Sequence, residues 1–468
     1  MSTSLLFADW ALLPDGWARN VLLAWDEQGR LATVQAGATA SAGVPRAAGP
    51  VLPGMPNLHS HAFQRGFAGL TEYRSRPQGD NSAGADSFWS WRTLMYRFAQ
   101  RISPDTLEAI ATQLYIEMLR AGYTSVCEFH YVHHDANGKP YADAAEMSLR
   151  LLRAAQRTGI GMTLLPVLYQ TAGFGGKPPL AEQRRFLHDT DAMLRLLERL
   201  APMCAQAGAR LGLAPHSLRA VPEDSLLHAL AGLKAIDAQA PVHIHIAEQQ
   251  REVDDCIAWS GTRPVTWLFD HVDVDARWCL VHATHMDWDE RRRLAHSGAV
   301  AGICATTEAN LGDGVFEAEP YLAQHGAWGI GSDSHASVSV AEELRLFEYG
   351  QRLGLQQRNV LASDTHLQVA DRLYLEAVAG GAGASGRDVA GLAPGQQADF
   401  VVLDGAHPTL AGLDGAQALA THVFANHGHE TLAEVRTAGR SRVQHGAHAL
   451  QADAARQFIA ARASLLAD

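Results

Sequence analysis

The sequence has none of the long apolar runs that carry a chain across a membrane. No stretch reaches 18 consecutive apolar residues, and the first residues, MSTSLLFADWALLPDGW, contain no basic segment but do contain Asp9 and Asp15. These absences argue against both a membrane span and an export signal. We therefore expect no membrane partner and a cytoplasmic location.

Cysteine is scarce, and its spacing forms no recognisable framework. The chain has five cysteines, an odd number, and no C-x-x-C pair. This pattern argues against a disulfide scaffold and against a structural zinc ribbon. A reducing compartment such as the cytoplasm agrees with it.

Positive charge is in deficit, with 38 basic against 50 acidic residues and a net charge of -12. Such a chain repels a phosphate backbone, so we expect no nucleic-acid partner. An anionic small molecule would need arginines placed locally to receive it. At 468 residues and 47% hydrophobic content, the chain is long enough for one large domain and a smaller one.

Short apolar segments alternate with longer stretches of helical spacing through the middle of the chain. Strands are expected at residues 51–58, 124–131, 161–169, 210–215, 242–247, 278–282, 300–305 and 328–332, and helices between them at 105–121, 141–158, 180–207, 224–239 and 289–297. Eight such units predict an α/β fold in which residues 51–384 form a (β/α)8 TIM barrel.

The two chain ends have a different pattern, with short strand-like pieces separated by turn signals. These pieces lie at residues 4–8, 20–24, 31–35, 398–403, 421–425, 435–438 and 442–444. We expect residues 1–50 and 385–450 to combine into one discontinuous small β-sandwich domain, and residues 451–468 to form a C-terminal helix. The polar, glycine-containing segment at residues 75–87 is expected to be a flexible loop after the first barrel strand.

Candidate metal-binding side chains stand at three of the expected strand ends. His59 and His61 are two residues apart, so on a strand both rings face the same side, and His245 and Asp333 each follow another apolar run. Taken singly, a buried histidine bound to a carbonyl is the commoner explanation. The joint occurrence favours a catalytic divalent metal, because a buried unpaired carboxylate is costly. Zinc suits these ligands best, and ferrous iron is the alternative.

Acid and base groups accompany these ligands. Glu248 lies three residues after His245, where the strand should give way to the loop at the barrel mouth, and His282 ends another strand. We expect Glu248, His282 and Asp333 to be catalytic, with an activated water as the nucleophile.

In this order on strand ends, His59, His61, His245, His282 and Asp333 resemble the amidohydrolase superfamily over nearly the whole chain. Its two-metal members carry a bridging carboxylated lysine on the fourth strand, whereas this chain has APH at residues 214–216. That departure and the H-x-x-E pattern at 245–248 resemble the branch with one metal, whose members mostly deaminate. The resemblance therefore implies one divalent ion per subunit.

Longer matches resemble one family of this branch, the formimidoylglutamate deiminases of histidine degradation. They are PNLHSHAFQRG at 56–66, SWR at 90–92, FHYVHH at 129–134 and APHSLRAV at 214–221. The resemblance implies hydrolysis of N-formimidoyl-L-glutamate, a small dicarboxylate, to N-formyl-L-glutamate and ammonia by a homodimer. The substrate-binding residues that it implies are Gln64, Arg92, Tyr131, His216 and Arg219.

Two alternatives stay open at this point. One is another deaminase of the same branch, acting on a purine, a pyrimidine or a guanidine, for which two carboxylate-binding arginines would serve no purpose. The other is an inactive barrel that serves as a binding protein, which the full set of ligands disfavours. The G-x-G-x-x-G match at 381–386 follows a helical stretch and not a strand, so it does not indicate a dinucleotide site.

Overall fold

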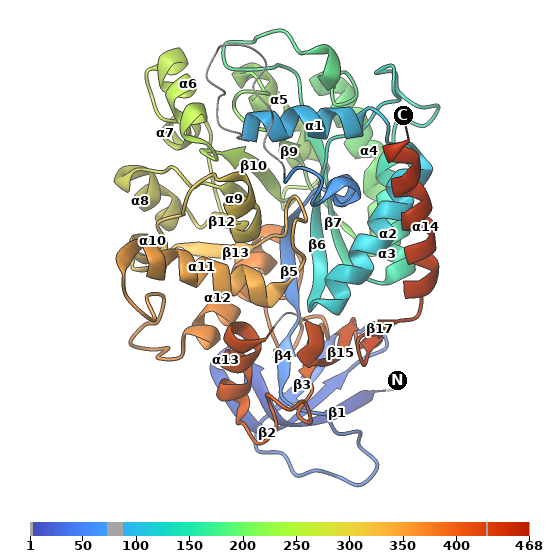
Figure 1. The fold of residues 1–468 in the computed structure, drawn as a ribbon, viewed down its shortest axis with the longest axis vertical. Coiled ribbons are helices and arrows are strands. Elements are labelled where there is room, and N and C mark those ends of the chain that lie inside the picture. Colours follow the sequence, from blue (N-terminus) through green and yellow to red (C-terminus); the bar gives the residue numbers. More distant parts are fainter. Residues whose placement is uncertain (1–2, 73–87, 427–428, 468) are drawn as a thin grey trace.

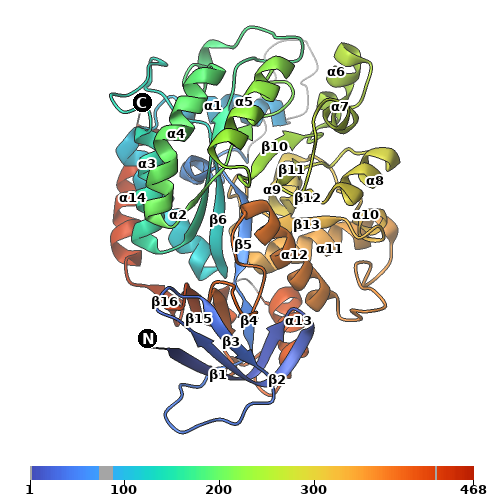
Figure 2. The same ribbon diagram turned by 180° about the vertical axis from the view of Figure 1, so that it is seen from behind.

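The computed structural model describes residues 3–72, 88–426 and 429–467. The loop expected at residues 75–87 lies outside them. Figures 1 and 2 show a larger part, in which helices surround central strands, above a smaller part that contains strands from both chain ends.

The larger part contains two parallel sheets whose carboxyl ends share one edge. The first is built from β5 (Met55–Ser60), β6 (Tyr123–His130), β7 (Gly161–Leu168), β8 (Arg210–Leu211) and β9 (Ala214–Pro215), and the second from β10 (Val242–Ile246), β11 (Trp278–His282), β12 (Val300–Ile303) and β13 (Ala327–Ile330). Isolated parallel bridges connect Leu213 with Val242 and Ser60 with Asp333, so each sheet meets the other at both of its edges. This arrangement is of the TIM-barrel type.

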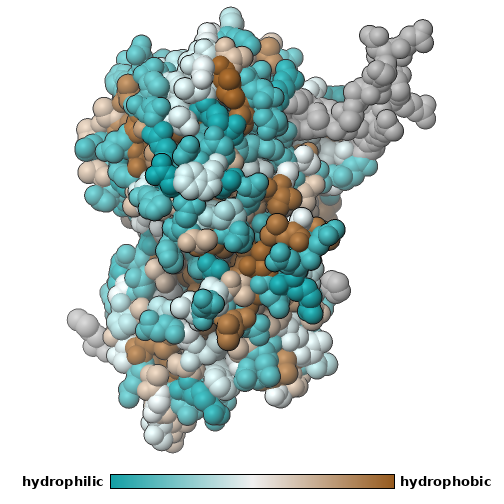
Figure 3. All heavy atoms as spheres, turned by 90° about the vertical axis from the view of Figure 1, so that its left-hand side faces the viewer, coloured by the Kyte–Doolittle hydropathy of each residue, from teal (hydrophilic) through white to brown (hydrophobic). Residues whose placement is uncertain are grey.

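Helices cover these strands. They are α1 (Phe88–Ala99), α2 (Pro104–Arg120), α3 (Glu146–Thr158), α4 (Thr190–Ala207), α5 (Glu223–Ile236), α6 (Gln250–Ser260), α7 (Pro264–His271), α8 (Trp288–Ser297), α9 (Ala305–Leu311), α10 (Ala318–Leu322), α11 (Val340–Leu355) and α12 (Val369–Ser385). Local signals set their ends: α2 begins at a capping box of Ser103 and Thr106, and α4 ends at left-handed Gly208. The face that carries α6, α7, α8 and α10 is mostly hydrophilic, as an outer helical layer requires (Figure 3).

The smaller part is one eight-stranded sheet in the order β17-β16-β15-β14-β4-β1-β2-β3. Its strands are β1 (Ser4–Leu13), β2 (Gly16–Trp25), β3 (Leu31–Gln35), β4 (Val51–Pro53), β14 (Phe400–Leu403), β15 (Leu432–Thr437), β16 (Arg440–Gln444) and β17 (Ala447–His448). The strand predicted at 51–58 is therefore divided. Gly54 separates β4, which pairs with β1 and β14, from β5, and a Cβ there would lie 2.3 Å from Thr124.

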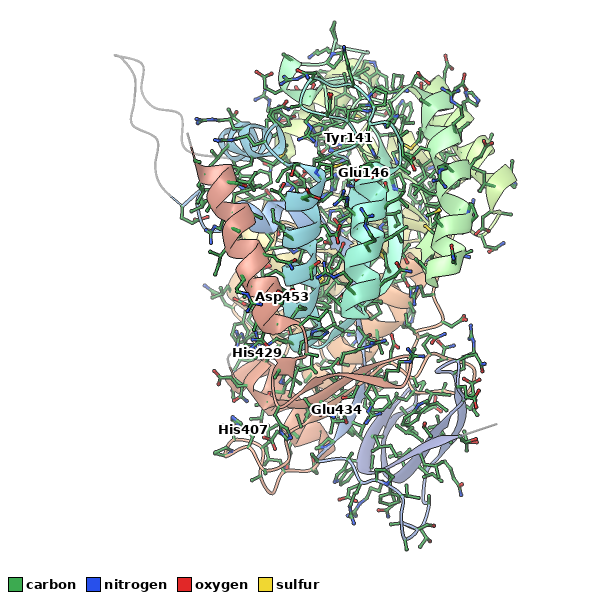
Figure 4. The ribbon with its side chains drawn as sticks, turned by 90° about the vertical axis from the view of Figure 1, so that its right-hand side faces the viewer. Tyr141, Glu146, His407, His429, Glu434 and Asp453 are labelled. Atoms are coloured by element: carbon green, nitrogen blue, oxygen red, sulfur yellow. The ribbon has the colours of Figure 1, made fainter. Side chains whose placement is uncertain are left out.

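One predicted end strand is wrong, because residues 421–425 belong to the helix α13 (Gly415–Ala425). The Asp414 carboxylate accepts a hydrogen bond from the Gln417 backbone N–H and starts this helix, and buried Leu419 and Val423 recur four residues apart. The predicted final helix is confirmed as α14 (Gln451–Leu466). This helix lies beside α2. In Figure 4, Asp453 marks the lower end of α14, and Glu146 marks the start of α3.

Close packing of α12 on β13 yields a first prediction, at Gly380. A Cβ at Gly380 would lie 1.8 Å from the Trp328 carbonyl oxygen, whereas one at Gly383, on the same helix, would meet only a Val300 methyl at 3.5 Å. We expect Gly380→Ala to lower the free energy of unfolding by about 3 kcal/mol or more, because backbone atoms must move apart. Gly383→Ala should be neutral or stabilising by about 1 kcal/mol. Urea denaturation of both variants tests this, and equal stability would contradict it.

Candidate active site

The four predicted metal ligands come together at the carboxyl ends of the parallel strands. The Nε2 atom of His59 lies 2.9 Å from Nε2 of His245, 3.2 Å from Nε2 of His61 and 3.4 Å from an Asp333 carboxylate oxygen. That Asp333 oxygen is 3.3 Å from His61 Nε2. β5, β10 and the turn after β13 thus bring ligands more than 270 residues apart in the sequence into one cluster.

Backbone conformation at this edge is unusual. Ala247, His282, Ala283, Asp333 and His335 all have φ between 44° and 67°, the left-handed region that side chains disfavour. Each such residue costs on the order of 1–3 kcal/mol and persists only where its surroundings fix it. Here the Asp333 N–H donates to the His59 carbonyl at 3.0 Å, and the His61 N–H donates to the Asp333 carbonyl at 3.2 Å. These bonds hold the turn after β13 against β5.

The chemistry of the cluster fits a divalent metal ion. The His61 Nδ1 hydrogen is donated to the Phe129 carbonyl at 2.8 Å, so its Nε2 lone pair faces the other ligands. Burial lowers the pKa of His61 to about 3 and lowers that of His245 well below its usual value, so both rings stay neutral. Two ligand atoms about 2.1 Å from a tetrahedral zinc ion lie about 3.4 Å apart, close to the spacings found here.

His282 and Glu248 stand beside this cluster. The Nε2 atom of His282 is 3.8 Å from both Glu248 and Asp333, and its Nδ1 is 3.3 Å from a Glu308 oxygen. Burial disfavours a charged ring, but Glu248, Glu308 and Asp333 outweigh it and raise the pKa of His282 to about 10. Burial raises the pKa of Glu248 to about 7, although His282 and Arg219 oppose the shift. A carboxyl group with a pKa near 7 can both give and take a proton at neutral pH.

A pocket opens beside the cluster of predicted metal ligands. The predicted substrate-binding residues Gln64, Arg92, Tyr131, His216 and Arg219 all line it, together with His61, His245, Glu248, His282 and Asp333. Gln64 donates to the Tyr131 hydroxyl at 2.8 Å, and Arg92 lies over the Tyr96 ring. Arg219 is 3.9 Å from Glu248 and 3.8 Å from Glu252. The pocket therefore presents two guanidinium groups beside an acid and the predicted metal ligands.

Sequence reasoning missed several residues of this region. Tyr96 and Tyr169 line the pocket, and the Gln183 side chain donates to both hydroxyls, at 3.0 Å and 2.7 Å. Tyr169 ends a predicted strand, and Glu252 lies four residues after Glu248, so both carried a usable signal. Glu308 carried none, because its partner His282 is 26 residues away.

A second group of buried histidines, His130, His133, His134 and His188, lies outside the pocket. The ring centroids of His133 and His134 are within 4.6 Å of that of His188, and each of these two rings donates its Nε2 hydrogen to a backbone carbonyl. The Nε2 atoms of His130 and His188 are buried without a hydrogen-bond partner among the described residues. Burial lowers the pKa of each of these two to about 3.

These two histidines predict a loss of stability in acid. An unfolded histidine titrates near pH 6.5. Below that pH, the unfolded chain therefore binds protons at these two positions, whereas the folded chain keeps both rings neutral. By pH 5 each group should lower the free energy of unfolding by on the order of 2 kcal/mol. His188→Gln should reduce this pH dependence, measured by urea denaturation between pH 7 and pH 5. The exposed control His228→Gln should keep the wild-type dependence, and an unchanged dependence in His188→Gln would contradict the prediction.

Comparison with known proteins gives consistent matches along the chain. The Amidohydrolase family profile matches residues 51–443, and the profile described as Formimidoylglutamate deiminase HutF, N-terminal domain, matches residues 3–47. The formimidoylglutamate deiminase of Pseudomonas aeruginosa is 54% identical over 463 residues, covering 99% of this chain and 100% of its own length. The 8-oxoguanine deaminase of the same organism is 27% identical and covers 78% of each chain.

Solved structures agree. The crystal structure of an amidohydrolase from Brucella melitensis has a TM-score of 0.92 and 46% identity, covering 99% of this chain and 100% of that one. An adenosine deaminase from Xanthomonas campestris with bound zinc has a TM-score of 0.77 and 19% identity over 98% of each chain, which shows a shared fold. Among the described residues, no helix has the length and apolar character needed to cross a membrane.

Proposed function

Since the chain belongs to the amidohydrolase family and, within it, to the formimidoylglutamate deiminases, we propose that the pocket described above is where its reaction takes place. The reaction is the hydrolysis of N-formimidoyl-L-glutamate to N-formyl-L-glutamate and ammonia in histidine degradation. The observation that carries the assignment to this pocket is that Arg92 and Arg219 line it together with Glu248 and three of the four proposed ligands, His61, His245 and Asp333.

The proposed metal site holds one divalent ion per subunit, zinc in the first place and ferrous iron as the alternative. His59, His61, His245 and Asp333 would hold it, since their ligand atoms converge as a small divalent cation requires. When bound, the ion supplies an activated water for hydrolysis.

The substrate's two carboxylates are matched by two arginines. A guanidinium group binds a carboxylate through two parallel hydrogen bonds, and in a chain with a net charge of -12 only such local groups can attract a dianion. Burial opposes the charge on Arg219, but Glu252 and Glu248 raise its pKa and keep it protonated. Gln64, Tyr131 and His216 would provide the remaining polar contacts of the substrate.

The proposed proton transfers use the three acid and base groups at the pocket floor. Asp333 accepts one proton as water adds to the formimidoyl carbon, and Glu248 delivers a proton to the imino nitrogen. The nitrogen then takes a second proton, the one that Asp333 accepted, so that the C–N bond breaks and ammonia leaves. The oxygen that the carbon keeps returns its remaining proton to Glu248 and becomes the formyl oxygen. His282 stabilises the charge that develops on that oxygen.

The finer organisation of the chain is part of the same proposal. We propose that the two parallel sheets close into an eight-stranded barrel within residues 51–384, with β5 as its first strand, since β4 (Val51–Pro53) pairs within the smaller sheet. Residues 1–50 and 385–450 would form the small β domain, and residues 451–468 the C-terminal helix. The strands of the small domain form a single eight-stranded sheet, and its folding into a sandwich is part of the proposal. A cytoplasmic homodimer is what the resemblance suggests.

Ammonia release from N-formimidoyl-L-glutamate by zinc-loaded protein tests the function, with N-formimidoyl-glycine and guanine as controls. Rapid release from the glutamate compound alone is expected. The relative that deaminates 8-oxoguanine keeps a purine deaminase as the second candidate, and activity on guanine alone would favour it.

Metal removal gives a separate prediction. A ligand that binds only the folded state at 100 times its dissociation constant stabilises that state by about 2.7 kcal/mol. We therefore expect chelator-treated protein to melt at a lower temperature and to regain its melting temperature when zinc is restored. Calorimetry of both forms measures this, and identical melting temperatures would count against a metal held by these four ligands.

A further inference from the structure

A chain of buried polar side chains lies behind the metal ligands and outside the pocket. Its members are Asn57 and Ser60 on β5, Glu128 on β6, and Ser332 and His335 after β13, each at most 1% exposed. β5 and β6 run side by side in both views, with α2 beside them in Figure 1. None of the five lines the pocket, so the substrate does not explain why so many polar groups are buried here.

Glu128 is the point at which this chain ends. Its carboxylate accepts hydrogen bonds from the Ser60 hydroxyl at 2.7 Å, the Ala62 backbone N–H at 2.6 Å and the Tyr115 hydroxyl at 3.1 Å. Two of these donors, Ser60 and Ala62, alternate in the amino-acid sequence with the proposed ligands His59 and His61. Glu128 therefore binds the segment that carries these ligands on the side opposite the proposed metal site.

The donors and acceptors of the chain all point in one direction. Because Ser60 gives its only hydrogen to Glu128, the His335 Nε2 atom, at 3.2 Å, must donate to the Ser60 oxygen. The Nδ1 atom of His335 then accepts from the Ser332 hydroxyl at 3.0 Å.

The far end of the chain returns to β5. The Ser332 hydroxyl accepts from the Asn57 amide at 2.6 Å, while the Asn57 oxygen accepts the backbone N–H of Ser332 at 3.1 Å and that of His59 at 3.3 Å. One polarised chain thus runs from Asn57 to Glu128.

This chain joins the two segments that supply three of the four ligands. Ser60 lies between His59 and His61, and Ser332 and His335 flank Asp333. Asp333 and His335 have φ values of 44° and 60°, so the turn that presents the Asp333 carboxylate depends on such bonds to keep its shape. We propose that Glu128, acting through Ser60 and His335, is a positioning residue that sets the affinity of the four-ligand site for its metal ion. The proposal rests on the metal site proposed above.

Glu128→Gln is the variant that tests this. The amide keeps the shape of the side chain but has one acceptor oxygen and an NH2 group that only donates, so it cannot receive all three donors, and the polarity of the chain is broken. Loss of such support for metal ligands typically weakens metal binding by about 10- to 100-fold. We expect a rise of this size in the zinc dissociation constant, measured by competition with a chromophoric chelator. The kcat of the zinc-saturated variant should fall by a smaller factor.

Two matched controls separate positioning from general destabilisation. Glu343 is equally buried and likewise accepts a backbone N–H and a hydroxyl, both from Thr306, but it contacts no metal ligand. Glu343→Gln should leave the zinc dissociation constant unchanged. Tyr115→Phe removes one donor to Glu128 without interrupting the hydrogen-bond chain. Its zinc dissociation constant should stay close to that of the wild-type protein.

The outcomes are distinct. An unchanged zinc dissociation constant in Glu128→Gln, or an equal rise in Glu343→Gln, overturns the proposal and leaves the function intact. If Glu128→Gln does not fold, Ser60→Ala interrupts the same chain and serves the same comparison. A wild-type protein that binds no divalent ion would overturn the proposed metal centre and this inference together.

Discussion

Replacing Glu248 by glutamine is expected to lower kcat by about 10²- to 10⁴-fold, the usual contribution of a general acid or base. Glutamine fills the same space and can still pair with Arg219, but it cannot carry a proton to the imino nitrogen. The side chain is 3.8 Å from His282 and 3.9 Å from Arg219 and belongs to no metal ligand set. Zinc content should therefore match that of the wild-type protein.

Steady-state kinetics with parallel metal analysis measures both quantities. Glu252→Gln is the matched control, because Glu252 is four residues further along the chain, buried and also beside Arg219, yet it does not line the pocket. It should change KM more than kcat. A Glu248→Gln enzyme with unchanged kcat would remove Glu248 from the mechanism, whereas a loss of zinc would make it a residue of the metal site.

Replacing Arg219 by methionine is expected to lower kcat/KM for N-formimidoyl-L-glutamate by about 10²- to 10³-fold. Removing one partner of a buried charge pair costs about 2–5 kcal/mol, and here the loss leaves the substrate carboxylate, Glu248 and Glu252 without their cation. The kcat/KM of Arg219→Lys should lie between those of the wild-type enzyme and Arg219→Met, because lysine keeps the charge but cannot form two parallel hydrogen bonds to a carboxylate. Initial-rate kinetics over a range of substrate concentrations measures the effect.

A second substrate sharpens this test. N-formimidoyl-glycine lacks the side-chain carboxylate. On this shorter compound, a variant without the arginine that binds that carboxylate should therefore have nearly the same kcat/KM as the wild-type enzyme. Comparing Arg219→Met and Arg92→Met on both substrates therefore assigns one arginine to each carboxylate. Arg263→Met, which breaks the ion pair with Glu290 away from the pocket, should leave kcat/KM unchanged. An equally unchanged Arg219→Met would argue that the dicarboxylate is bound elsewhere.

Sequence and structure agree best where the signal was local. The helix capped by Ser103, the final helix at 451–466 and the strand at 31–35 lie where composition and turn residues predicted them. The error at residues 421–425 arose because Thr, Val and Phe in a short run favour a strand in isolation. An N-terminal cap seven residues earlier and burial of one helical face decided the matter. Likewise, the close approach of Thr124, from a neighbouring strand, to Gly54 is a tertiary contact that the local sequence does not reveal.

For the candidate site, the sequence by itself determined which residues could be grouped as the proposed ligands and the proposed acid, because parallel strands present their carboxyl ends at one edge wherever each strand lies in the chain. His59, His61, His245, Asp333 and Glu248 could therefore be grouped before any distance was known. Only the tertiary structure decided which side chains support them. Glu308 meets His282, Glu128 meets Ser60 and Glu252 meets Arg219 through contacts between different elements, and no spacing in the sequence encodes which buried carboxylate faces which partner.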